Sequence, residues 1–189
     1  MKKILCTLAY IFALFALPSA VSAGIKTEFG LGSGYVFYGD DDLRDFLSDF
    51  GSSSQVILCG DCMLDIPLAD SVILIFGLDS ILDARWKGSD SVILWDYCGF
   101  VGFNIYPGLA GLYGTAGYCV GRRTDFFNLT DAENTIKNTS FGNGFAFGLG
   151  YDFGYSKLHF APQLSASWRH IPRGGSSDDI LEIKFRIKK

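Results

Sequence analysis

The sequence predicts an all-β fold, a single eight-stranded antiparallel up-and-down transmembrane β-barrel. Three observations predict it. Hydropathy alternates with a period of two residues along most of the 189-residue chain, which is typical of strands whose two faces meet different surroundings. The apolar face is unusually rich in aromatic residues. Tight turns alternate with longer polar loops, as in barrels with short periplasmic turns and longer extracellular loops.

The segment 141–155 shows the alternation most clearly. From Phe141 to Tyr155 the odd positions are aromatic or leucine, with Asn143 as the exception, and the even positions are Gly, Ala or Asp. A strand of this kind needs an apolar medium on one side and a crowded space on the other. A bilayer outside a narrow closed barrel provides both.

The first 23 residues predict a cleaved signal peptide. Lys2 and Lys3 precede an apolar run from Ile4 to Leu17, and small residues follow up to Ala23. This order of a positive segment, an apolar segment and a cleavage site is that of a secretory signal peptide. An N-terminal membrane anchor is the alternative, but the run is short for a spanning helix. We therefore expect a barrel domain over 24–189.

The first half of this domain predicts four strands, at about 25–38, 55–66, 72–87 and 92–106. The first alternates Phe, Leu and Tyr with Lys, Glu and Gly. The second sets Val, Leu and Ile against Gln and Asp. The third begins apolar on both faces and then alternates Leu and Trp with Asp, Arg and Lys. The fourth sets Trp, Tyr and Phe against Asp, Gly and Asn.

The second half predicts four more strands, at about 109–121, 141–155, 158–170 and 180–188. The first of these is small and glycine-rich. The last two alternate Leu, Phe, Ile and Trp with charged or polar residues. Longer loops at about 39–54, 122–140 and 171–179 alternate with tight connections, so an even strand count places both termini on the short-turn rim.

The volume of the aromatic side chains indicates which face is outside. A soluble lipocalin-type barrel has the same alternation with its apolar face inward. An eight-stranded barrel is only wide enough inside for side chains or one small ligand, whereas most of the 17 Phe, 9 Tyr and 3 Trp lie on the apolar face. A soluble two-sheet sandwich remains the alternative. The membrane arrangement predicts aromatic girdles at the two interfaces, formed by Trp86, Trp95, Phe103, Phe153, Tyr155 and Trp168.

With these features the chain resembles the small eight-stranded outer-membrane barrels of the OmpA, OmpX and OmpW type, over about 25–188. The resemblance rests on alternation, loop asymmetry and the signal peptide. It implies location in the bacterial outer membrane, contact with outer-membrane lipid and insertion by the barrel assembly machinery. Such barrels usually end in an aromatic residue, whereas this chain continues from Phe185 to Lys189.

Charged residues on the polar face predict an ion-paired lumen. An unpaired buried charge costs several kcal/mol, and the two signs nearly balance, with Asp65, Lys87 and Lys157 also on this face. This favours a structural plug over a narrow polar pathway. The inward glycines allow either close packing or a thin gap. The predicted lumen network consists of Lys26, Glu28, Asp61, Asp79, Asp83, Arg85, Asp96, Asp152, Arg169, Glu182, Lys184 and Arg186.

The loop 39–54 contains an amphipathic helix by its spacing. Leu43, Phe46, Leu47 and Phe50 fall at i, i+3, i+4 and i+7, after an Asp that can cap the helix. We expect the helix to cover the barrel mouth or to dip into the outer leaflet. This loop and the loop 122–140 are candidate contact surfaces for an extracellular ligand. The carboxylates of the loop 39–54 predict a solvated acidic face rather than a metal site.

The cysteines and histidines predict no catalytic site. Pairing residue 106 with 109 makes Cys98 and Cys119 diagonal neighbours on the inner face, either as small inward side chains or as a disulfide. His170 near the outer rim has no Ser two positions on, so a lipid-modifying enzyme is an alternative only.

The net charge of −4 predicts no nucleic-acid binding. We expect no cofactor and no metal. We expect a non-enzymatic protein acting in surface interaction, envelope structure or narrow solute passage, with a periplasmic lipocalin-like carrier as the alternative.

Overall fold

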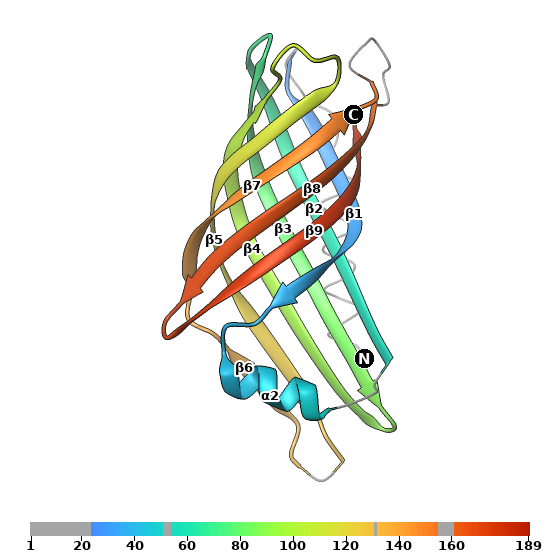
Figure 1. Ribbon diagram of the computed structural model, residues 1–189, viewed down its shortest axis with the longest axis vertical. Helices are drawn as coiled ribbons and strands as arrows, with labels where there is room; N and C mark the ends of the chain where they lie inside the picture. The colour runs from blue at the N-terminus through green and yellow to red at the C-terminus, as the bar shows by residue number, and fades with distance from the viewer. Residues whose placement is uncertain (1–23, 51–53, 131, 155–160) are drawn as a thin grey trace.

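The computed structural model describes residues 24–50, 54–130, 132–154 and 161–189 (Figure 1). The predicted signal peptide and Tyr155 lie outside these residues. The described residues form one helix, α2 (Asp41–Asp49), and a set of antiparallel strands: β1 (Lys26–Phe37), β2 (Ser54–Ala69), β3 (Val72–Lys87), β4 (Asp90–Ile105), β5 (Leu112–Asn128), β6 (Thr135–Asn138), β7 (Gly142–Asp152), β8 (Ala161–Arg173) and β9 (Ser176–Lys188).

Eight of these strands close into a barrel, which confirms the predicted fold class. The hydrogen-bonded order is β4-β3-β2-β1-β9-β8-β7-β5, and pairing of β4 with β5 completes the ring. The short strand β6 extends the sheet beside the end of β5. Among the described residues, no helix is long and apolar enough to cross a membrane.

The two rims differ, as Figure 1 shows. The C-terminus and the turns that follow β2 and β4 lie at one end, which we call the short-turn rim. Helix α2, β6 and the turns that follow β3 and β8 lie toward the other end, the long-loop rim. The start of β1 and the residue after β9 meet at the short-turn rim, where Thr27 and Lys189 exchange two backbone hydrogen bonds of 3.0 and 2.9 Å.

Two predicted loops are wrong in part, because the strands continue into them. The loop expected at 171–179 is a hairpin that turns at Gly174 and Gly175, and Gly174 has a φ of 65°. In the loop expected at 122–140, β5 runs on to Asn128 and pairs with β6. Both extensions carry polar residues at consecutive positions, so they lack the hydrophobic contrast that marks a strand in sequence.

The register of β4 and β5 also differs from the prediction. Cys98 pairs with Gly121, and Cys119 pairs with Phe100. The prediction assumed a tight turn pairing 106 with 109, whereas the first pair beyond the turn is Ile105 with Gly114. Cys98 and Cys119 still lie as diagonal neighbours inside the barrel, and both are buried free thiols.

Inward glycines make room for large rings, so the lumen is packed rather than hollow at these positions. A Cβ at Gly150 would lie 2.2 Å from Cζ of Tyr113, which is fully buried. A Cβ at Gly117 would lie 2.3 Å from Cζ of Phe100. Of the two arrangements that the glycine pattern allowed, the structure has close packing.

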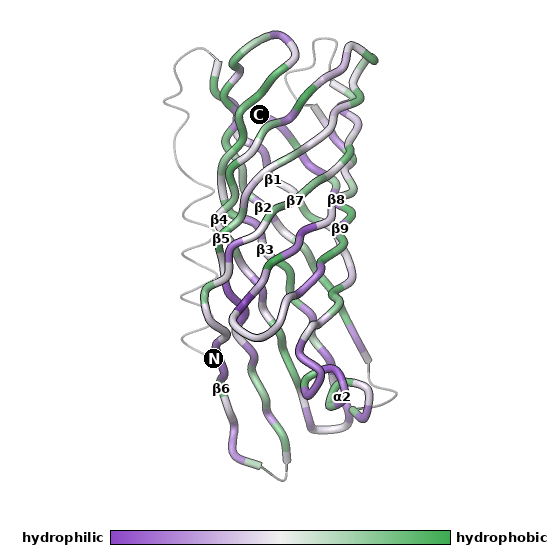
Figure 2. The backbone as a smooth tube through the Cα atoms, turned by 60° about the vertical axis from the view of Figure 1, so that its left-hand side comes forward, coloured by the Kyte–Doolittle hydropathy of each residue, from purple (hydrophilic) through white to green (hydrophobic). Residues whose placement is uncertain are grey.

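The outer surface of the barrel carries the apolar side chains. Leu31, Phe141 and Leu149 are 76%, 69% and 67% exposed, and outward-facing Phe, Leu, Ile, Val and Tyr side chains are exposed on all eight strands of the ring. Figure 2 shows hydrophobic and hydrophilic residues alternating along the strands. This is the inverse of a soluble barrel, whose apolar side chains face its interior.

Candidate functional site

The lumen holds most of the buried charge of the barrel, and it is the candidate site. Among the described residues, ten buried carboxylates face six buried cations and the half-buried Arg85. They come from inward positions of several strands, because alternate residues of each strand point into the barrel. The ion pairs form successive groups from the short-turn rim to the long-loop rim.

The first group, at the short-turn rim, centres on Lys188. Its Nζ lies 2.8 Å from Oε1 of Glu28 and 2.6 Å from Oδ2 of Asp65. The side-chain amide of Gln163 donates to Glu28 at 2.9 Å and to Asp152 at 3.1 Å. One ammonium and one amide therefore hold three carboxylates from β1, β2 and β7.

The second group lies in the middle of the lumen and belongs to β9. Lys184 Nζ lies 2.5 Å from Asp79, 2.9 Å from Glu182 and 3.2 Å from Asp61. Arg186 also binds Asp61, through Nε at 3.0 Å and Nη2 at 2.9 Å. The cations of β9 thus cross to the carboxylates of β2 and β3.

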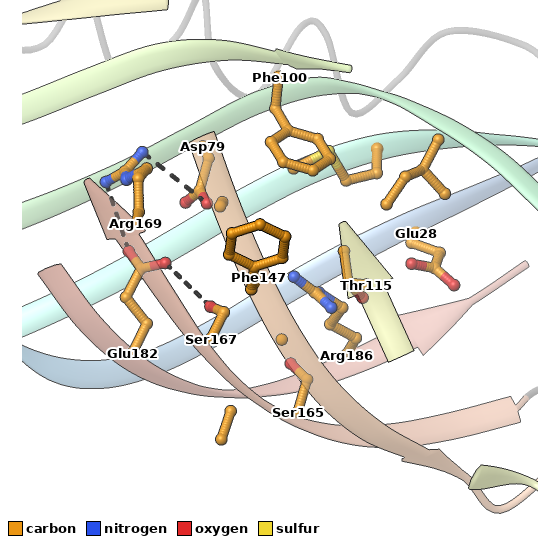
Figure 3. Close-up of a pocket in the computed structure, with 15 residues that line it drawn as sticks. Glu28, Asp79, Phe100, Thr115, Phe147, Ser165, Ser167, Arg169, Glu182 and Arg186 are labelled. Carbon is orange, nitrogen blue, oxygen red and sulfur yellow. Dashed lines mark hydrogen bonds and ion pairs between the residues drawn. The ribbon is translucent and has the colours of Figure 1, made fainter. Parts of the chain in front are cut away.

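Arg169 of β8 connects the middle of the lumen to the outer half. Its guanidinium is 1% exposed and lies 3.4 Å from Asp96, 3.6 Å from Glu182 and 3.9 Å from Asp79. Figure 3 shows it between Asp79 and Glu182. Nη1 also donates to the sulfur of Cys98 at 2.6 Å. A single guanidinium therefore contacts side chains from β3, β4 and β9.

The outer group uses two more arginines. Arg173 pairs with Asp96 and, at 2.5 Å, with Asp178. Arg123 pairs with Asp178 at 2.5 Å and with Asp125 at 2.7 Å. Asp178 thus joins the two guanidinium groups.

The outer mouth is closed by Tyr38 and helix α2. The Tyr38 hydroxyl donates to Asp83 at 2.9 Å, and Arg85 binds the same carboxylate at 2.9 Å. Burial, and then the Asp83 charge, raise the pKa of Tyr38 well above its ordinary value. The hydroxyl therefore stays protonated and remains a donor.

Helix α2 places its apolar face against the lumen end. Asp40 caps the helix by accepting from the Leu43 backbone N–H at 3.1 Å, as its sequence predicts. The buried side chains of the helix, Leu43 and Leu47, pack in one cluster with Phe50 and with inward apolar residues of the strands. Of the two predicted positions, the helix takes the one across the mouth (Figure 1). The cluster also contains Val36, Tyr38, Cys59, Ile81, Val92, Leu94 and Ile180.

A small cavity lies in the middle of the lumen. This cavity of about 30 Å³ lies beside Arg169 and Arg186, lined also by Phe100, Ser165 and Phe147 (Figure 3). This is about the volume that one water molecule occupies in the liquid. Within the described ranges, no group of three or more His, Cys, Asp or Glu side chains is arranged to hold a metal ion. The arrangement can neutralise charge and fill the barrel.

The structure brings most of the predicted lumen residues together. Lys26 is the exception: it lies exposed at the start of β1, at the short-turn rim, and no ion pair is found for it among the described residues. Lys87 is likewise exposed, and Lys157 lies outside the described residues. Sequence reasoning missed Arg123, Asp125, Arg173, Asp178 and Lys188, which join the network. The sequence offered one signal for these five residues. They occupy inward positions if the period-two pattern is continued to the ends of the predicted strands or just beyond them.

The predicted girdle residues lie on the outer surface where they are described. Trp86, Phe103 and Phe153 are exposed, and Trp95 and Trp168 are half-buried. The indole N–H of Trp168 donates to Asp179 at 3.0 Å.

His170 also faces outward, next to Trp168. Its Nδ1 lies 2.8 Å from the same Asp179 oxygen, and its ring lies 5.6 Å from that of Phe145. In the described part of the chain, no serine or cysteine is hydrogen-bonded to His170. The geometry thus gives this histidine a carboxylate partner but no paired nucleophile, which nucleophilic catalysis needs.

Comparison with known proteins agrees on the fold. No protein-family model matches the sequence, and no curated protein matches it. Among solved structures, Neisserial surface protein A is similar with a TM-score of 0.55 and 10% identity, over 88% of this chain and 96% of that chain. Ail, the attachment invasion locus protein of Yersinia pestis, crystallised with the heparin analogue sucrose octasulfate, is similar with a TM-score of 0.54 and 11% identity, over 88% and 99%.

These solved structures are small eight-stranded outer-membrane barrels, so the predicted likeness to that class is confirmed at the level of fold. At identities of 10% and 11%, the similarity shows the architecture and carries no residue roles to this chain.

Proposed function

We propose that this protein is an integral β-barrel of the bacterial outer membrane, non-enzymatic, with a sealed lumen. It acts through the rim that carries the long loops, in surface interaction or envelope structure. The observation that carries the proposal is the lumen itself, in which ten buried carboxylates and six buried cations are packed together and a cavity of about 30 Å³ lies beside Arg169. A hydrated ion or solute needs a continuous polar space, and the described lumen side chains occupy that space.

The outer surface supports membrane residence. Soluble proteins rarely expose large contiguous apolar patches, yet apolar side chains are exposed on every strand of this barrel. In a bilayer the same side chains contact apolar lipid chains, and a closed barrel satisfies its backbone hydrogen bonds internally. On this basis, outer-membrane lipid and the barrel assembly machinery are its expected partners.

The filled lumen argues against a soluble lipocalin-like carrier. Such a carrier needs an apolar cavity for its ligand. Here the interior holds Arg169, Lys184 and their carboxylates instead, all nearly inaccessible to solvent. The enzyme alternative has less support, because the described contacts of His170 include no nucleophile.

The long-loop rim is the proposed contact surface for an extracellular partner. The polar face of α2 presents Asp41, Asp42, Asp45 and Asp49 outward, while β6 carries Lys137 over the ring of Phe127 at 5.5 Å. The acidic helix and the β6 segment therefore stand beside each other at this rim, where the rings of Phe46 and Phe127 lie 5.6 Å apart, and exposed loops held on a rigid scaffold suit recognition.

Two measurements test the proposal. Envelope fractions are run on a detergent gel with and without boiling, and we expect a heat-modifiable band in the outer-membrane fraction. The folded protein is then reconstituted in planar bilayers, where we expect no stable conductance steps. The variant Phe100→Ala/Arg169→Ala, which removes two lumen-filling side chains, is the positive comparison and should conduct. Stable steps in the wild-type protein would overturn the sealed lumen, and a single band in the periplasmic fraction would overturn membrane residence.

A further inference from the structure

The barrel wall is incomplete between β1 and β2. The two strands pair only from Lys26–Asp65 to Gly32–Cys59. Beyond that point β1 remains paired with β9 as far as Phe37, and β2 remains paired with β3 as far as Ser54. Figure 1 shows β1 turning away from β2 toward α2. Among the described residues, the halves of β1 and β2 nearest the long-loop rim are therefore not paired with each other and face one another as open edges.

An unpaired edge in a bilayer is unfavourable. Each unsatisfied backbone group in hydrocarbon costs several kcal/mol, and closure normally removes such edges from a barrel. One side chain spans the gap, since the Ser33 hydroxyl donates to the carbonyl oxygen of Ile57 at 2.8 Å. The other edge groups require an occupant that offers polar atoms as well as apolar surface.

A cavity lies along the β1 edge of this gap. Its volume is about 290 Å³, close to the lower end of the range for small-molecule sites, roughly 300–1,000 Å³. Helix α2 forms one wall, and the β1 residues from 35 to 38 form another. The lining residues are Tyr35, Val36, Phe37, Tyr38, Arg44, Leu47, Ser48 and Arg85.

The lining is amphipathic and contains two arginines. Tyr35 and Phe37 are half exposed on the lipid side of the wall, and their ring centroids lie 4.7 Å apart. The two charged side chains that line the cavity are both arginines, Arg44 and Arg85. Arg44 pairs with the exposed Asp41 at 2.7 Å, and such a pair is weakly held. Arg85 binds the buried Asp83 through Nε at 3.2 Å and Nη2 at 2.9 Å.

We propose that this lateral pocket binds one lipid of the outer leaflet whose phosphate-bearing head group is net anionic. The acyl chain lies against Tyr35 and Phe37, and the anionic head group meets Arg44 and Arg85 at the edge of α2. Arginine is well suited to a phosphate because its planar fork donates two parallel hydrogen bonds. The head-group oxygens also accept from backbone N–H groups of the open edges. The inference rests on the proposed membrane residence.

Native mass spectrometry of the full chain tests the pocket. The folded protein is released from nanodiscs of phosphatidylglycerol or of phosphatidylcholine, and retained lipid is counted. We expect one retained phosphatidylglycerol, and about tenfold less retention in Arg44→Gln/Arg85→Gln, since charge-assisted bonds are lost. Arg122→Gln, an arginine on the outer face of β5 away from the pocket, is the matched control and should retain the lipid.

A second pair of variants tests the space rather than the charge. Ser48→Trp fills the cavity from α2, whereas Asp49→Trp places the same ring on an exposed position that does not line it. We expect only Ser48→Trp to lower retention. Heat-modifiable migration first establishes that each variant is folded and inserted, so a failure of membrane residence is seen separately.

Three results would overturn the proposal. Equal retention of the two lipids would show that the pocket does not select an anionic head group. Displacement by inorganic phosphate together with full retention in Ser48→Trp would show a phosphate site without an acyl chain. A lipid-free dimer would show that a second copy covers the open edges.

Discussion

The side-chain ammonium of Lys188 lies 2.8 Å from the carboxylate of Glu28. Lys188 ends the last strand, and Glu28 stands near the start of the first, so this pair joins the two ends of the barrel from the inside. The same ammonium binds Asp65 of β2 at 2.6 Å. The backbone ladder between β1 and β9 closes the barrel at this seam, and the ion pairs fasten it across three strands.

Replacing Lys188 should therefore weaken the closed barrel. Lys188→Gln leaves Glu28 and Asp65 buried without their cation, and removing one partner of a buried pair typically costs about 3–5 kcal/mol. We expect a loss of that order in the free energy of unfolding, measured by urea titration in lipid vesicles. Lys189→Gln is the matched control: that side chain is exposed, and surface changes usually stay within about 0.5 kcal/mol. Equal stability of the two variants would contradict the role of the seam.

Close packing of Tyr113 on Gly150 gives a second prediction. A methyl group at Gly150 would lie 2.2 Å from the ring of a fully buried tyrosine, which has no room to move. We expect Gly150→Ala to lower the free energy of unfolding by about 1–3 kcal/mol, as overpacking usually does. In Gly99→Ala the added methyl meets its nearest neighbour at 3.9 Å, so that variant should be near neutral. An unchanged free energy of unfolding in Gly150→Ala would instead indicate a thin gap at this position of the lumen.

The strands and their facing were predictable because alternation is a local property. Phe145 and Ala146 differ in their surroundings simply by being neighbours in a strand. Helix α2 was predictable for the same reason, since Asp40 and the spacing of Leu43 and Leu47 lie within one short segment. The position of the helix over the mouth was left open, because it depends on contacts with Val36 and other distant residues.

The lumen partners were not predictable, because they depend on the register of several strands at once. Arg169 meets Asp79, Asp96 and Glu182, and no spacing in the sequence encodes that meeting. The Cys98–Gly121 pairing was missed because the turn that fixes register is longer than a tight turn. The open edge of β1 was missed because both edge segments alternate like paired strands.

Helix α2 should shield Cys59 from water. Cys59 is 2% exposed and lies in the same apolar cluster as Leu47. Leu47→Asp places a charge in that cluster and should move the helix away from the mouth. We therefore expect a water-soluble maleimide to label Cys59 at least about tenfold faster, because a weakly held segment opens locally. Peptide mapping by mass spectrometry separates Cys59 from the other three thiols of the described residues.

Asp45→Lys provides the control for this experiment, because it changes the charge on the exposed side of the same helix, at a residue that does not line the pocket. Its Cys59 should remain as protected as in the wild-type protein. Fast labelling of Cys59 in the wild-type protein would contradict a helix closed over the mouth.

The three tryptophans should report the depth of the barrel in a bilayer. Trp168 donates its indole N–H to Asp179 at 3.0 Å, and a carboxylate on the lipid side is costly in hydrocarbon but tolerated at the interface. Tryptophan side chains also prefer the membrane–water interface. In variants that keep one tryptophan, we expect lipids brominated near the carbonyl group to quench Trp86, Trp95 and Trp168 more strongly than lipids brominated deep in the chain.

The comparison position for this measurement is Ile183, which is 62% exposed near the middle of β9. In a background whose native tryptophans are replaced by Phe, Ile183→Trp should show the opposite order, with the deep bromines quenching more. The difference is expected because Asp179 marks where the outer surface becomes polar. Ile183 lies four residues further along β9, toward the middle of the barrel. If Trp168 and Ile183→Trp were quenched alike by both lipids, the aromatic girdle would be wrong, and if neither were quenched the apolar surface would not lie in the bilayer.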